Sequence, residues 1–454
     1  MSGAYSGWWV AGTAQVDERS CCLERRSDRY WVWLIAVSLG GYLVLGRSFA
    51  YLGILPLKLF IGELVLAGFF LTRTRHVLGR WLTTLLYPST LTGFSMALAA
   101  FLFYGVFLLV RGYAAGYPLL LAVQNFVFNY YPFYLFLGIW VGARRPELIR
   151  RFVVAVGLLH GLYGLALLAG LRRAVPIYIA KDVPLFGQPA GAAALLVGLL
   201  CYPAASRAYQ GVLLAMNLLV LIGTQVRAEW LGFLLAFGLW TVLMRKSRIL
   251  WGVIAVAVLL CLIGALSDLR LPGMEDRGGD VTVKSLVGRV VAPVDRELAE
   301  QIAGRGILAT AGTYEWRKQW WRSIWSEIHR GEPAVMVFGP GYGYPLHRLH
   351  EALGNAVLRT PHNVFFYALG YGGWVGVLLF YVLQAQLGAL MLKVYRFSGQ
   401  PLGVLLWVMV LAEAHFGNWF ESPFGAIPTY LLLGMCAAPL VKMEGDEVAR
   451  FSWA

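Results

Sequence analysis

Charged residues are scarce in this chain. Of its 454 residues only 14% are charged, whereas 59% are apolar and the mean hydropathy is +0.65. Soluble proteins carry about 25% charged residues, so this composition excludes a soluble enzyme of that length. The sequence therefore predicts a membrane protein that crosses the bilayer many times.

Cysteine is also rare, and its spacing matches no metal-binding pattern. None of the cysteines falls in the long loop identified below, so we expect no disulfide. The N-terminus has no apolar segment behind a basic start and no small-residue cleavage site. It therefore predicts a loose cytoplasmic tail over residues 1–30 rather than a cleaved signal peptide. The cysteines are Cys21, Cys22, Cys201, Cys261 and Cys436.

Long apolar runs are abundant instead. A helix needs roughly 17 to 25 residues to cross a hydrocarbon core of about 30 Å, and about a dozen runs approach that length. We therefore expect an all-α fold with about twelve transmembrane helices. The runs are 31–46, 49–71, 94–110, 119–141, 152–171, 190–205, 211–226, 228–244, 250–266, 363–391, 401–418 and 424–441.

Basic residues give these runs an orientation, because short cytoplasmic loops collect Lys and Arg. With the N-terminus inside, every inner loop is basic and the short outer connections hold few cations. Such loops orient a membrane protein and need no nucleic-acid partner. The predicted divisions are a cytoplasmic tail (1–30), helices one to nine (31–266), a periplasmic loop (267–361), helices ten to twelve (362–441) and a cytoplasmic tail (442–454).

The few outer cations indicate an anion at the outer membrane face. Cations are uncommon in outer loops because Lys and Arg collect in the cytoplasmic ones, so their presence here favours a lipid-borne anionic ligand. Lys58 and Glu63 are ionisable groups inside an apolar run, which makes them functional candidates, and Lys58 is a candidate phosphate contact. The outer cations are Arg47, Arg111, Arg172, Arg173, Lys181 and Arg227.

The long outer loop contains an amphipathic helix, predicted over 313–330. Apolar residues at i, i+4 spacing, from Trp316 to Ile328, form one stripe that would lie on the membrane surface or over the mouth of the bundle. Arg317 flanks this stripe, where a snorkelling arginine is the simpler interpretation. The glycines of 339–343 predict a turn packed on the bundle, and they lack the Lys-Ser/Thr ending of a P-loop.

The sequence TPHN opens the next apolar run. Thr360 is a candidate N-cap and Pro361 a natural first helical residue, which would put His362 and Asn363 in the first turn. The positive end of the helix dipole there would attract an anion and favour a neutral, proton-accepting histidine. The alternative is that both side chains only satisfy backbone groups at the membrane surface.

A family resemblance favours the functional interpretation. His362-Asn363, nine residues, Gly373, two residues and Gly376 resemble the H-N-x9-G-x-x-G pattern of the O-antigen ligase group in the O-antigen ligase/polymerase superfamily. The many spans, the late outer loop, Arg317 in EWRKQWW and Arg227 in TQVRAEWLG are similar to that family too. The resemblance implies a GT-C-like glycosyltransferase of the bacterial inner membrane, with a periplasmic active site, that needs no metal or other cofactor.

The same resemblance implies the substrates and the roles. The donor would be a polysaccharide on undecaprenyl diphosphate, and the acceptor a sugar hydroxyl of the lipid A-core, both embedded among membrane lipids. His362 would act as the general base. Arg227 and Arg317 would stabilise the departing diphosphate, because guanidinium binds phosphate oxygens bidentately. Weaker candidates for binding the diphosphate are Arg111, Lys58, Arg172 and Asn363.

Two kinds of rival remain. An O-antigen polymerase or a protein O-oligosaccharyltransferase would share the donor and the chemistry, and the sequence separates these poorly. A secondary transporter would suit the span count and the interior Lys58 and Glu63. Transporters of that size usually show two repeated halves, and this chain shows no internal repeat, so the transferases are favoured.

Overall fold

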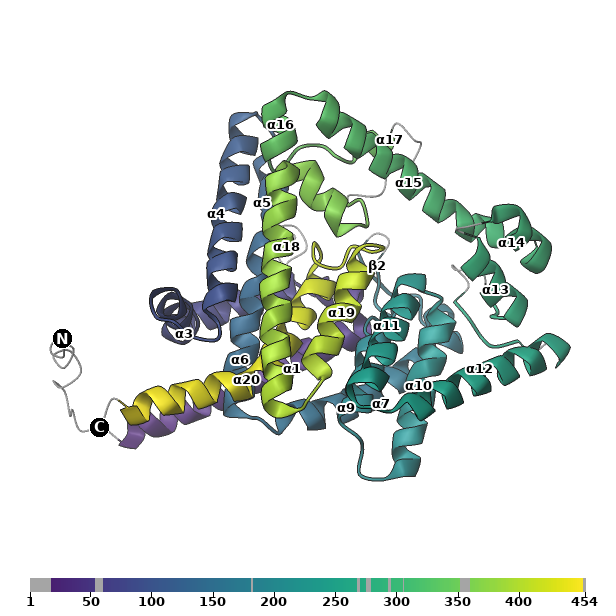
Figure 1. The fold of residues 1–454 in the computed structure, drawn as a ribbon, viewed down its shortest axis with the longest axis horizontal. Coiled ribbons are helices and arrows are strands. Elements are labelled where there is room, and N and C mark those ends of the chain that lie inside the picture. Colours follow the sequence, from purple (N-terminus) through teal and green to yellow (C-terminus); the bar gives the residue numbers. More distant parts are fainter. Residues whose placement is uncertain are drawn as a thin grey trace.

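Helices dominate the structure (Figure 1). The computed structural model describes residues 18–53, 60–180, 183–267, 270–274, 279–292, 295–304, 306–351 and 360–451. It is 78% helical, and the single sheet within these ranges is a hairpin of β1 (Tyr178–Ala180) with β2 (Val183–Pro184). The predicted all-α class is confirmed.

The first part of the chain and the last three long helices form one bundle (Figure 1). Its tightest crossing joins α6 to α20, where Gly138 and Gly434 bring the two backbones together, as small residues do in membrane helices. The bundle helices are α1 (Glu18–Leu45), α2 (Arg47–Ala50), α3 (Ile61–Leu86), α4 (Thr92–Ala114), α5 (Leu119–Tyr130), η1 (Tyr131–Phe133), α6 (Tyr134–Arg144), α7 (Leu148–Leu168), α9 (Ala192–Cys201), α10 (Arg207–Thr224), α11 (Arg227–Leu243), α18 (Val364–Ser398), α19 (Leu402–Ala414) and α20 (Pro423–Phe451). Beside them lie α8 (Leu171–Ala174), which has no buried residue, and α12 (Ser247–Ser267), which projects away from the bundle in Figure 1.

Six helical segments among the described residues are long and apolar enough to cross a membrane. Several shorter apolar helices accompany them, including α19 and α9. The chain is therefore a multi-pass membrane protein, and the number of twelve spans stays a prediction. The six segments are Thr92–Ala114, Leu119–Arg144, Leu148–Leu168, Arg207–Thr224, Val364–Ser398 and Pro423–Met443.

The second predicted span, 49–71, is wrong. The described helix α3 begins at Ile61 and continues to Leu86 with a kink at Arg73, whose φ and ψ are −136° and 27°. Just before the kink, the Thr72 hydroxyl donates to the Gly68 carbonyl at 2.8 Å, a back-bond that bends helices. Hydropathy alone misplaced this helix because its second half carries basic residues.

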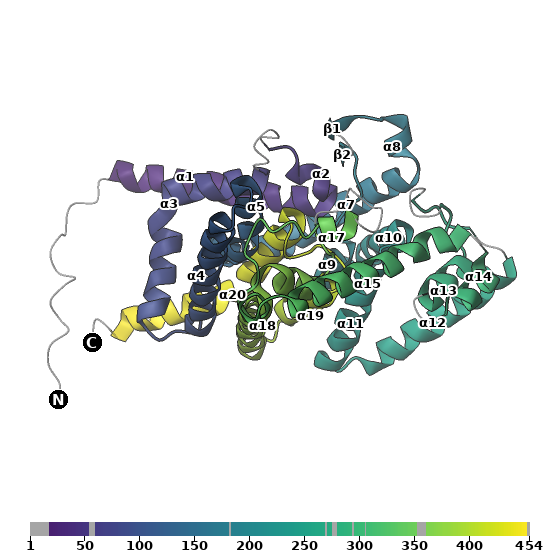
Figure 2. The same cartoon turned by 90° about the horizontal axis from the view of Figure 1, so that it is seen from above.

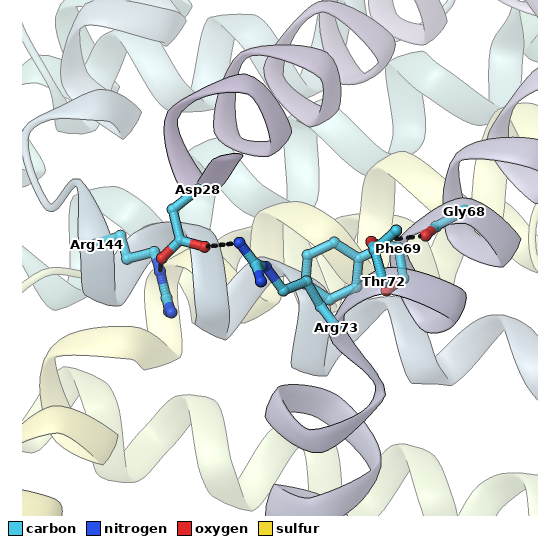
Figure 3. A network of polar contacts seen from close by, with 6 residues as sticks. All are labelled: Asp28, Gly68, Phe69, Thr72, Arg73 and Arg144. Atoms are coloured by element: carbon cyan, nitrogen blue, oxygen red, sulfur yellow. Dashed lines mark hydrogen bonds and ion pairs between the residues drawn. The ribbon is translucent and has the colours of Figure 1, made fainter. Parts of the chain in front are cut away.

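An ion-pair network holds the kink in place (Figure 3). Asp28 of α1 contacts Arg73 of α3 at 3.1 Å and the Nε of Arg144 in α6 at 2.7 Å. Arg144 also lies 4.0 Å over the ring of Trp140. All three charged side chains are at most 30% exposed, so the pairs are screened less than surface pairs. One carboxylate thereby ties together three helices.

The segment between α12 and α18 lies along one side of the bundle (Figure 1), and in the view from above α15 lies across the bundle (Figure 2). Its longest helix, α15, crosses from α14 to α16 along the upper right of Figure 1. Its helices are α13 (Val283–Val291), α14 (Arg296–Ala303), α15 (Gly306–Arg330), α16 (Pro333–Phe338) and α17 (Arg348–Glu351). The predicted helix over 313–330 therefore exists and starts seven residues earlier, so Thr313 is not its cap.

Candidate functional site

The predicted apolar stripe of α15 packs onto the bundle. Trp320 and Ile324 are fully buried and Ile328 is 1% exposed. The indole N–H of Trp320 donates to the Leu346 carbonyl at 3.1 Å, which satisfies the one polar group on this face. The helix therefore covers the start of α18, and Arg317 lies at the edge of the contact.

The His-Asn pair lies before α18 rather than in its first turn. Asn363 is the N-cap, and its side-chain oxygen accepts from the backbone N–H groups of Phe365 and Phe366 at 2.9 and 3.2 Å. The predicted cap at Thr360 is wrong by three residues, because Asn363 offers the helix a better acceptor. His362 has a φ of 51°, in the left-handed region that non-glycine residues seldom occupy.

A backbone break explains the spacing of the motif. Gly373 has φ 57° and ψ −159°, so α18 is two helices merged across a kink. The nine residues from Val364 to Gly372 form the short first helix, from the Asn363 cap to this break. A side chain at Gly373 would lie 2.5 Å from the backbone nitrogen of Gly339 and 2.6 Å from the Val337 carbonyl. Packing as well as conformation therefore requires glycine there.

The glycine-rich turn at 339–343 packs against α18 at the Gly373 break and against α4 of the bundle, as predicted. The Gly341 N–H donates to the Tyr371 carbonyl at 3.1 Å, and the Tyr342 N–H donates to the Leu108 carbonyl of α4 at 3.0 Å. Gly341 has a φ of 100°, and a Cβ there would lie 2.7 Å from the Gly112 nitrogen. The segment between α12 and α18 is thus hydrogen-bonded to both α18 and α4.

The C-terminal end of α19 joins Arg317 to the His-Asn pair. The side-chain amide of Asn363 donates to the His415 carbonyl at 2.8 Å, and Nη1 of Arg317 donates to the Phe416 carbonyl at 2.9 Å. These two carbonyls follow one another in the chain. Trp316 completes the group, because its ring lies 5.3 Å from the Arg317 guanidinium carbon and 6.2 Å from the His362 ring.

Arg227 reaches the same end of the bundle through the packing of α11 on α19. It is the first residue of α11, and a Cβ at Gly232 in that helix would lie 2.8 Å from Cγ of Glu413, near the end of α19. Five residues of helix rise about 7.5 Å, so Arg227 lies above that contact, on the side of the α19 carbonyls. The structure therefore joins Arg317 and Asn363 through consecutive carbonyls and places Trp316 in contact with both Arg317 and His362. It brings Arg227 to a neighbouring helix end.

One comparison bears on the family. Residues 212–381 match the family model described as O-antigen ligase. This match supports an O-antigen ligase family assignment. Members of this family are glycosyltransferase-like enzymes of lipopolysaccharide synthesis, which implies a polysaccharide donor and a lipid acceptor in the membrane. No curated protein shows significant similarity to the chain.

The matched range contains Arg227, Arg317, His362 and Asn363, whereas Arg111, Arg172 and Lys58 lie outside it. Arg111 is half-buried in the last turn of α4, next to the glycine that contacts the 339–343 turn. Arg172 lies in α8, in the connection that carries the β1–β2 hairpin. Lys58 lies outside the described residues.

Glu63 has structural partners. Its carboxylate accepts from the Tyr130 and Tyr131 hydroxyls, both at 3.0 Å, and from the Phe60 backbone N–H at 3.0 Å. The residue therefore caps the start of α3 and ties it to the α5–α6 connection. This arrangement gives Glu63 a role in the fold.

Sequence reasoning missed the parts of the site that are not side chains. The backbone carbonyls of His415 and Phe416 connect the His-Asn pair to Arg317. A sequence pattern cannot predict which backbone carbonyl will accept a hydrogen bond. Glu413 lies near the end of α19 and Glu421 just before α20, and they are 1% and 7% exposed. Burial raises the pKa of Glu421 to about 8, and the backbone N–H groups of Glu421 and Phe420 offset this in part. Both carboxyls therefore belong to the packing.

Proposed function

We propose that this chain is an O-antigen ligase that transfers polysaccharide from undecaprenyl diphosphate to a sugar hydroxyl of the lipid A-core. The observation that carries the proposal is the connection of Arg317 to Asn363 through the adjacent carbonyls of His415 and Phe416, just after α19. The cation proposed for the donor and Asn363, the residue next to the proposed base, are then held on consecutive carbonyls. The family match over Arg227, Arg317 and His362 supports the same assignment.

The transfer needs a proton acceptor and a stabilised leaving group. The acceptor oxygen attacks the anomeric carbon, the bond from that carbon to the phosphate oxygen breaks, and undecaprenyl diphosphate leaves with the electron pair. His362 takes the proton of the attacking hydroxyl, a role typically worth roughly 10²–10⁴-fold in rate. Arg317 and Arg227 bind the diphosphate oxygens as charge develops, without a divalent metal. Arg111, Arg172 and Lys58 are secondary candidates for the same anion.

The conformation of His362 is consistent with this role. A left-handed non-glycine residue costs about 1–3 kcal/mol, and such residues cluster at functional sites. Here the Asn363 cap follows immediately, so the short helix holds the histidine in its unusual conformation. A histidine whose backbone is held in one conformation is preorganised to meet an acceptor.

The proposal includes a topology. Basic inner loops support about twelve spans in the bacterial inner membrane, both termini in the cytoplasm, and a GT-C-like active site under a periplasmic loop at 267–361. A single cysteine placed beside Gly341 should react with a membrane-impermeant reagent from the periplasm. Reaction from the cytoplasmic side alone would contradict the arrangement.

The direct test compares wild-type protein with His362→Ala in nanodiscs that contain lipid-linked donor and lipid A-core. We expect donor binding to persist and transfer to fall by about 10² or more, in line with loss of a general base. Near-normal transfer by folded His362→Ala would remove the histidine from the chemistry.

The acceptor in that assay separates the ligase from its sister activities. Product on the lipid A-core is expected for a ligase, whereas a longer lipid-linked glycan would indicate a polymerase. A glycosylated peptide would indicate a protein oligosaccharyltransferase. Glycan transferred only to one of the latter two acceptors would overturn the ligase assignment and keep the transferase class.

A further inference from the structure

A second tryptophan of α15 contacts the backbone that leads into His362. The indole N–H of Trp321 donates to the Pro361 carbonyl at 2.7 Å. That carbonyl belongs to the peptide unit between Pro361 and His362, so the bond fixes the plane from which the His362 φ angle is measured. Pro361 is buried and Trp321 is half-buried, which keeps competing water away from the bond.

The Trp321 ring also holds the other side of the motif. It stacks on Phe366, with ring centroids 5.4 Å apart and 9° between the planes. Phe366 is itself one of the two residues whose N–H groups Asn363 caps. Trp321 therefore contacts the chain just before and just after the His-Asn pair.

Trp321 lies on the same helix, α15, as Arg317. Arg317 and Trp321 are four residues apart, so they lie on one face of α15 with a rise of about 6 Å between them. Arg317 is bonded to the Phe416 carbonyl at one end of this face, and Trp321 is bonded to the Pro361 carbonyl, next to His362, at the other. One rigid helix thus sets the separation between cation and base.

We propose that Trp321 is a positioning residue that holds His362 in its left-handed conformation and thereby sets the distance from the imidazole to the diphosphate-binding Arg317. The inference rests on the proposed function for the role of His362. In this proposal Trp321 acts through His362. Its contribution is geometric, and misplacement of a catalytic group by about 1 Å can cost about 10²-fold in rate.

The variant that isolates the hydrogen bond is Trp321→Phe, which keeps a ring to stack on Phe366 and removes the N–H. Trp320→Phe is the matched control, because it removes an indole N–H from the Leu346 carbonyl one residue earlier in α15. Trp325→Phe, at a position 43% exposed, is a second control that disturbs no buried packing. Thermal unfolding of each variant shows whether it is folded before activity is compared.

Two readouts are measured on each variant in nanodiscs. The first is transfer, as kcat and as KM for the lipid-linked donor, with and without His362→Ala. The second is the rate at which diethyl pyrocarbonate modifies His362, followed by mass spectrometry. For Trp321→Phe we expect kcat to fall about 10- to 100-fold with KM within about twofold. We also expect an altered modification rate, and no further loss of activity when His362 is already alanine.

The outcomes are separable. Trp321→Phe that matches Trp320→Phe and Trp325→Phe in both readouts overturns the positioning role. A full additive loss in the His362→Ala background also overturns it, because the tryptophan would then act elsewhere. Normal transfer by His362→Ala alone refutes the proposed function instead. In that case the modification rate of His362 in Trp321→Phe decides the positioning role by itself.

Discussion

Replacing Gly373 by alanine tests whether the backbone break in α18 holds the site together. The backbone at φ 57° and ψ −159° is essentially restricted to glycine, and placing another residue there costs roughly 1–3 kcal/mol. The new Cβ would also lie 2.5–2.7 Å from backbone atoms of Gly339, Val337 and Met336, which cannot rotate away. Overpacking of this kind adds roughly 1–3 kcal/mol, so we expect a total loss of about 4 kcal/mol.

Gly399→Ala is the matched control for this prediction. Gly399 caps the end of α18 with a φ of 70°, yet a Cβ there meets nothing within 4 Å. It therefore reports the cost of the left-handed backbone alone, about 1–2 kcal/mol. Both variants are compared with wild type by SDS titration of the refolded protein in mixed micelles. A loss in Gly373→Ala no larger than that in Gly399→Ala would refute the contact argument.

Three further predictions concern charge. Lysine at position 317 or 227 should lower transfer about 10- to 100-fold, because it keeps the charge and loses the planar fork, and full activity of Arg317→Lys with normal donor binding would contradict this. Glu421→Gln should stabilise the protein above about pH 4.5, since the unfolded carboxyl ionises there while the buried one keeps its proton up to about pH 8. The gain should reach about 3 kcal/mol near pH 7 and vanish below pH 4, and a gain independent of pH would show another cause. Chelator should leave transfer intact, and activity lost in EDTA and restored by Mg²⁺ would show a metal requirement.

The sequence alone determined the class of the protein and supplied the candidate site residues. Low charge and long apolar runs require a lipid environment whatever the tertiary arrangement, so the multi-pass class followed from composition. The i, i+4 stripe of α15 was also readable, because a helix repeats its contacts locally. The His-Asn-Gly spacing and the flanking arginines identified the family that the match over 212–381 supports.

Local signals failed where distant segments compete with them. The helix after TPHN begins at Asn363, since that side chain reaches both helix N–H groups and the carbonyl of His415, 52 residues away in the chain. The span predicted at 49–71 gave way to a kinked helix that is held by Asp28 from α1. Neither partner is visible within a local window of sequence.

The site itself was decided by tertiary structure. Arg317 and Asn363 are joined by two backbone carbonyls, and a carbonyl is present at every residue, so only its position in space distinguishes it. The spacing of nine residues between Asn363 and Gly373 could be matched as a pattern, but its meaning as a short helix ended by a break required the fold. The sequence specifies which chemical groups are present, whereas the direction in which each group points depends on which segments pack against it.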